Sequence, residues 1–84
     1  MNPHKNTVKT RMIRAIGLDT IERPRQLQLA AGTNEHHIVH ELYMLQKQGL
    51  VEYRVRRNIH AAGRNLTDIR LTRKGQALWR QLGK

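Results

Sequence analysis

The stretch from Gln26 to Val51 constrains the fold of this chain more than any other part of the sequence. It has the pattern of two helices joined by a tight turn and followed by a strand. Gly32 stands where the first helical run ends, and glycine tolerates the positive φ that such a turn needs. We expect the hydroxyl of Thr33 to cap a second helix over residues 34–48.

The second helix has one apolar face and one polar face. Ile38, Leu42 and Leu45 recur at positions i, i+4 and i+7, so they should pack on the core. Gly49 follows the helix as a left-handed cap, before Leu50 and Val51 open a strand. The opposite face carries side chains that form hydrogen bonds: Asn34, His36, His37, His40 and Gln48.

The remaining elements follow from periodicity and from the positions of glycine, proline and threonine. At 84 residues the chain has room for one core, so we expect a flexible terminus over residues 1–6 and a single domain over residues 7–84. Ile21 is suited to a short strand in the connector. The predicted elements are a helix over 7–16, a helix over 24–31, the helix over 34–48, a strand over 51–56, a loop over 57–67, a strand over 68–71 and a helix beginning after Thr72.

Two segments carry a family resemblance. The run from Leu27 to Thr33, continued through Leu42, Leu45 and Gly49-Leu50-Val51, resembles the winged helix-turn-helix of bacterial and phage transcription regulators. The segment from Asp68 to Gly75 resembles the end of the wing and the next helix in MarR-like and PadR-like regulators. The resemblance implies an α+β fold: a winged helix-turn-helix with a three-helix core, a two- or three-stranded β wing and a C-terminal helix. It also implies sequence-specific binding of double-stranded DNA.

The charge agrees with an anionic partner. Sixteen Lys and Arg against six Asp and Glu give a net charge of +10, which favours fast, salt-sensitive association with nucleic acid. The chain has no cysteine, and its N-terminal stretch lacks the apolar segment of a signal peptide. No run of apolar residues approaches the length of a membrane span. We therefore expect a cytoplasmic, nucleoid-associated protein with no membrane partner.

If the helix over 34–48 docks in the major groove as in the family, five side chains match the positions that face the bases. Asn34 would pair bidentately with an adenine, and neutral histidine would donate to N7 or O6 of guanine. The expected base contacts are Thr33, Asn34, His36, His37 and His40.

The wing, residues 54–70, is expected to hold the DNA backbone or the minor groove. Arg64, beside Gly63, is the best candidate for the minor groove, where arginine meets an enhanced negative potential. Two further arginines flank the start of the helix over 24–31, where a phosphate would be favoured. The full set is Arg23, Arg25, Arg54, Arg56, Arg57, His60, Arg64, Arg70 and Arg73.

Other functions have weaker support. An enzyme is not expected, because no phosphate loop, activated nucleophile or paired acidic cluster is present. His36 and His40 have metal-ligand spacing, but without further ligands we expect no metal, cofactor or small-molecule effector. Two rivals stay open: a protein-interaction module, such as a phage protein that binds a host factor, and an excisionase-like architectural protein. A homodimer through the first and last helices, with Trp79 at its centre, and a monomer with Trp79 in the core also stay open.

Overall fold

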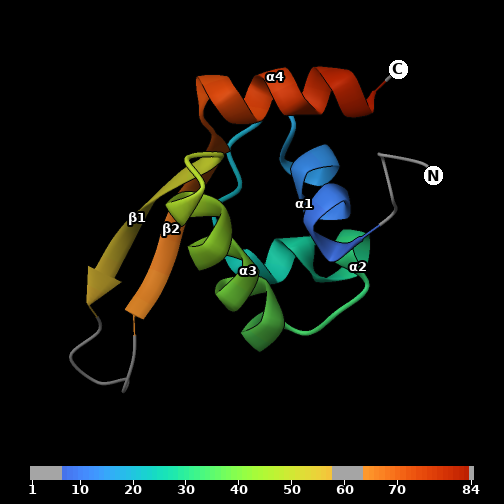
Figure 1. Ribbon diagram of the computed structural model, residues 1–84. Coiled ribbons are helices and arrows are strands. Elements are labelled where there is room, and N and C mark those ends of the chain that lie inside the picture. Colours follow the sequence, from blue (N-terminus) through green and yellow to red (C-terminus); the bar gives the residue numbers. More distant parts are fainter. Residues whose placement is uncertain (1–6, 58–63, 84) are drawn as a thin grey trace.

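The computed structural model describes residues 7–57 and 64–83. Helical segments come first, an antiparallel hairpin follows, and a C-terminal helix ends the chain (Figure 1). The predicted order of helices and strands is confirmed. Over the described residues the elements are α1 (Val8–Ile16), η1 (Pro24–Leu27), α2 (Gln28–Ala31), α3 (Glu35–Lys47), β1 (Val51–Arg57), β2 (Arg64–Leu71) and α4 (Arg73–Leu82).

The first helix is closed at both ends by local hydrogen bonds. The Thr7 hydroxyl accepts from the backbone N–H of Thr10, and the Thr10 hydroxyl accepts from the backbone N–H of Thr7, which makes a capping box. The helix ends at Gly17, whose φ is +52°. A glycine is suited to this position because other residues are strained at such a φ.

The second helical run is tighter than expected. Residues 24–31 divide into the 3₁₀ turn η1 and the single α-helical turn α2, and the predicted continuous helix is wrong in this respect. Gly32 follows with φ +70°, as predicted, and its N–H donates to the Gln28 carbonyl.

The predicted cap of α3 is displaced by one residue. Asn34, not Thr33, caps this helix, and its side-chain oxygen accepts from the backbone N–H of His37 at 2.9 Å.

The end of α3 is a Schellman motif. The N–H of Leu50 donates to the Leu45 carbonyl at 2.9 Å, and the N–H of Gly49 donates to the Gln46 carbonyl at 3.0 Å. Gly49 has φ +76°, and Leu45 and Leu50 are both buried beside it. The predicted left-handed cap is confirmed, and it sets the direction in which the chain enters β1.

The hairpin contains a β-bulge. Glu52 pairs with Arg70 and Arg54 pairs with Thr67, so Asp68 and Ile69 together oppose Tyr53 alone. Asp68 has φ +53°, a value that Asp tolerates better than most residues. The other edge of β2 pairs with the connector, because Ile21 and Ile69 exchange two backbone hydrogen bonds of 2.8 Å. The expected short strand at Ile21 is confirmed.

Two expectations about the hairpin are wrong. The predicted loop over 57–67 includes the first four residues of β2, where the bulge breaks the strict alternation that identifies a strand. Leu66 and Thr67 are both buried as a result. Val51, Tyr53 and Val55 alternate with charged residues, a pattern that predicts one buried face of β1. Val55 is nevertheless 47% exposed, because the outer part of the hairpin projects beyond the helices (Figure 1).

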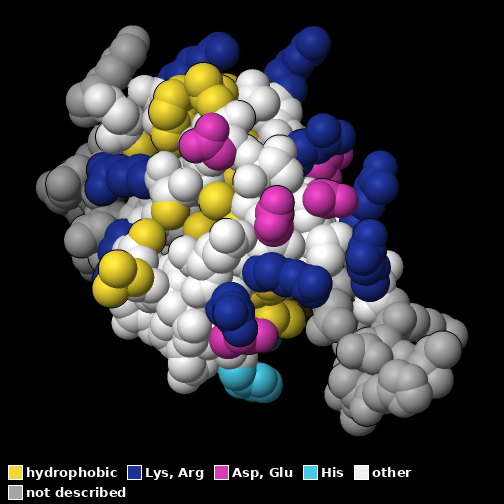
Figure 2. Space-filling view, turned by 180° about the vertical axis from the view of Figure 1, so that it is seen from behind, with side chains coloured by type: hydrophobic (Ala, Val, Ile, Leu, Met, Phe, Trp, Pro, Cys, Tyr) yellow, Lys and Arg dark blue, Asp and Glu magenta, His cyan; other side chains and the backbone are white. Residues whose placement is uncertain are grey.

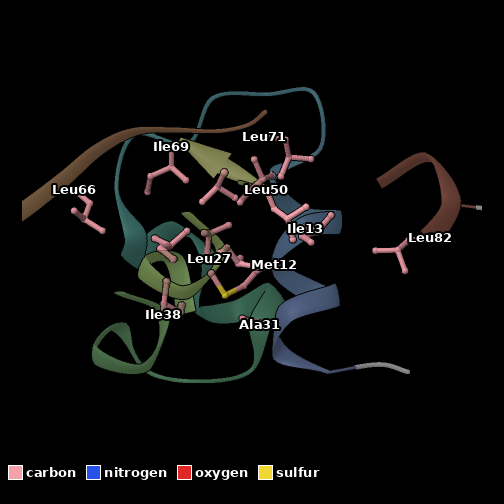
Figure 3. Packing of buried hydrophobic residues seen from close by; sticks show 14 residues of the cluster. Met12, Ile13, Leu27, Ala31, Ile38, Leu50, Leu66, Ile69, Leu71 and Leu82 are labelled. Carbon is pink, nitrogen blue, oxygen red and sulfur yellow. The ribbon is translucent and has the colours of Figure 1, made fainter. Parts of the chain in front are cut away.

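A single aliphatic core holds the helices and the hairpin together (Figure 3). Ile38, Leu42 and Leu45 are its contribution from α3, as their spacing predicts. Trp79 is half-buried against this core and lies beside Gly17. The fully enclosed side chains come from α1, η1, α3 and both strands: Met12, Ile13, Ile16, Leu27, Ile38, Leu42, Leu45, Val51 and Ile69.

Candidate functional site

The N-terminal part of α3 uses several of its polar side chains within the helix itself. The side-chain oxygen of Asn34 caps the helix by accepting from the backbone N–H of His37. The Thr33 hydroxyl lies 2.9 Å from Nδ1 of His37, and Nε2 of the same ring lies 3.8 Å from Oε1 of Glu41. Three of the five predicted base contacts, Thr33, Asn34 and His37, therefore have partners on α3 or its cap.

A second group of side chains on α3 points to solvent. His36 and His40 are exposed and have no hydrogen bond or ion pair within the described residues. Tyr43 is 50% exposed, and the Lys47 ammonium lies 5.0 Å from its ring centroid, a cation–π contact. Tyr43 and Lys47 were not among the predicted contacts. Their positions, seven and eleven residues after His36, are the sequence signal that would have identified them.

Two arginines of the hairpin are paired with acidic side chains on its outer face. Arg70 Nε lies 2.5 Å from Oε1 of Glu52, and Arg54 Nε lies 3.7 Å from Oδ2 of Asp68. Both pairs line a hollow that also includes Thr20 and Tyr53. Figure 2 shows dark-blue Lys and Arg side chains with magenta carboxylates between them on the hairpin side of the molecule. Arg54 and Arg70, two of the predicted backbone contacts, are therefore already paired with acidic neighbours.

The other predicted backbone contacts differ in how far the structure describes them. Arg56 is exposed on β1 and has no ion pair within the described residues. Arg23, Arg25 and Arg73 are exposed at the starts of η1 and α4. The backbones of Arg57 and Arg64 pair where the described parts of β1 and β2 end, and only their backbones are described. His60 lies outside the described residues.

The N-terminal end of α3 and the far end of the hairpin point to the same end of the molecule (Figure 1). The helix α4 lies at the opposite end. This arrangement brings the N-terminal part of α3, which includes the exposed residues His36 and His40, to the same end of the domain as the outer part of β1, which includes Arg56. Arg80 belongs to α4 and not to this end of the domain.

The described part of the chain offers little support for a metal site or a membrane-spanning helix. Over residues 7–57 and 64–83, no three His, Asp or Glu side chains are grouped so that they could hold a metal ion. Each helix in these ranges is too short or too polar to cross a bilayer. Comparisons with protein-family profiles, curated proteins and solved structures find no match to this chain.

Proposed function

We propose that the chain is a winged helix-turn-helix domain that binds double-stranded DNA in a sequence-dependent way and regulates transcription. In this proposal α3 enters the major groove, and the hairpin is the wing that contacts the backbone or the minor groove. The element order, the Ile21 bridge to β2 and the Schellman end of α3 all support this assignment of the fold.

The proposal rests on one observation. In a chain of net charge +10, the N-terminal end of α3 and the far end of the hairpin lie at the same end of the molecule. The major groove admits one α-helix, and the groups that read it must project from the face opposite the core. The exposed side of α3 meets this requirement because His36, His40, Tyr43 and Lys47 lie opposite its buried side chains. A hairpin that extends to the same end of the molecule is placed to contact phosphates beside that groove.

Fluorescence anisotropy with a labelled duplex of random sequence, across a salt series, tests the proposal. Each phosphate contact contributes about −0.9 to the slope of log K against log salt concentration. We expect a steep slope, and we expect Arg56→Gln to make it shallower by roughly 0.9. Arg80→Gln removes the same charge from α4 and should leave the slope nearly unchanged.

The outcomes separate the rival functions. Steep salt dependence together with an enriched sequence, after repeated selection of the tightest duplexes, supports a specific regulator. Steep dependence without an enriched sequence would replace the regulator with an architectural protein. No binding to duplex DNA at low salt would contradict the proposal and favour a protein partner for α3.

A further inference from the structure

We infer that a stripe of four side chains on α3, formed by His36, His40, Tyr43 and Lys47, reads the bases and selects guanine. This inference rests on the proposed function and deepens it. It keeps two of the five predicted base contacts, His36 and His40, and adds Tyr43 and Lys47. It leaves out the three whose polar atoms have partners in the structure: Thr33, Asn34 and His37.

Asn34 is unsuited to reading adenine. A bidentate pair with adenine needs both the oxygen and the nitrogen of the side-chain amide. The Asn34 oxygen already accepts the N–H of His37 at 2.9 Å, and this bond caps α3. Recognition of adenine by Asn34 would weaken the N-terminus of the helix that presents it.

The ring of His37 is held along the flank of α3. Its Nδ1 lies 2.9 Å from the Thr33 hydroxyl, four residues earlier, and its Nε2 faces the Glu41 carboxylate, four residues later. Both nitrogens are thus directed at neighbours, one just before the helix and one within it. A base edge would have to displace one of these partners before it reached the ring.

The stripe lies opposite the core. Successive residues of an α-helix rotate by about 100°, so positions 36, 40, 43 and 47 fall within a sector of roughly 60°. Ile38, Leu42 and Leu45 occupy the other side of the helix and are buried. From His36 to Lys47 the stripe extends over roughly 16 Å of helix, at about 1.5 Å per residue.

The chemistry of the stripe favours acceptor-rich bases. Its groups are two imidazoles, a phenol and an ammonium, with no carboxylate to accept from cytosine and no carboxamide to pair with adenine. Guanine presents two acceptors, N7 and O6, in the major groove. The Lys47 ammonium lies 5.0 Å from the centroid of the Tyr43 ring, so a cation–π contact brings these two groups together on the stripe.

Selection from a random duplex library, with base preferences measured for the wild type and two variants, tests the inference. We expect the wild type to enrich guanines on one strand, and replacement of one of them by adenine should weaken binding at least ~5-fold. His40→Gln should change the preference at one position from guanine to adenine, because glutamine pairs with adenine. Asn34→Ser keeps a cap and should enrich the same sequence as the wild type.

The inference would be overturned if Asn34→Ser changed the enriched bases while His40→Gln left them unchanged. It would also fail if the wild type bound duplexes tightly without enriching guanine, and DNA binding itself would then stand. If the wild type bound no duplex at low salt, the proposed function would fail first. Circular dichroism of each variant confirms that the helices are intact.

Discussion

The Thr72 hydroxyl donates a hydrogen bond to the Gly49 carbonyl at a distance of 2.5 Å, and it also accepts a hydrogen bond from the backbone N–H of Gly75. The start of α4 is thereby fixed to the turn that ends α3. The backbone N–H of Thr72 donates to the Leu50 carbonyl at 3.0 Å, and the Lys74 ammonium donates to the Gln48 carbonyl at 3.2 Å. The two segments that carry the family resemblance therefore meet at this junction.

Gly75→Ala should destabilise the domain by at least ~2 kcal/mol, although alanine normally favours a helix. A Cβ at this position would overlap the Leu50 carbonyl, which is backbone and cannot rotate away. Urea unfolding measures the effect. Gly83→Ala, at the other end of α4, meets only ordinary contacts and serves as the control. Equal stability of the two variants would contradict the close approach of α4 to Leu50.

Asn34→Ala should lower the free energy of unfolding by about 1 kcal/mol, because it removes the side-chain oxygen that caps α3. Asn34→Ser retains a capping oxygen and should lose much less. The comparison uses the midpoints of thermal or urea unfolding. If the alanine variant were as stable as the serine variant, the helix would not depend on this cap.

Thr67→Val should leave the stability unchanged or raise it by about 1 kcal/mol. The Thr67 hydroxyl oxygen is buried and has no hydrogen-bond partner within the described residues, so its removal costs no bond there. Thr20→Val, at an exposed position, is the control and should be neutral. A loss of more than about 1 kcal/mol in Thr67→Val would reveal a bond that the hydroxyl makes in solution.

Much of the fold was predictable because its signals are local. Gly32 and Gly49 mark the ends of helices, and the spacing of Ile38 to Leu45 identifies the buried face of α3. The start of β2 was not predictable in the same way. The bulge at Asp68 shifts the alternation of buried and exposed side chains, and only the pairing with β1 shows where the extra residue lies.

The sequence predicts that the candidate site lies on α3 and the hairpin, but it does not predict which of their polar side chains are available to a ligand. Thr33 and Asn34 are both good capping residues, and the sequence does not show which of them is used. The pairing of Arg70 with Glu52 depends on the register of the hairpin, which also lies beyond local sequence signals. These choices decide which polar groups remain available to a ligand.

Glu52→Gln should strengthen DNA binding more than removal of one negative charge elsewhere on the surface would. It releases Arg70 from a pair that is half-exposed and contributes little to stability, roughly 0–1 kcal/mol. The salt-dependence slope should steepen by up to about 0.9 if Arg70 then contacts a phosphate. Glu22→Gln makes the same charge change at an exposed connector position. Equal gains in affinity from both variants would mean that only net charge matters.

The proposal that DNA binds to α3 and the hairpin is tested most directly by titrating the ¹⁵N-labelled chain with duplex DNA. The amide chemical shifts are monitored during the titration. We predict that the largest changes occur in α3 from Glu35 to Lys47 and in the outer part of β1, around Arg56. The amides of α1 and of the second half of α4 should change least. Changes concentrated on α1 and α4, or no changes at all at low salt, would contradict the placement of DNA on α3 and the hairpin.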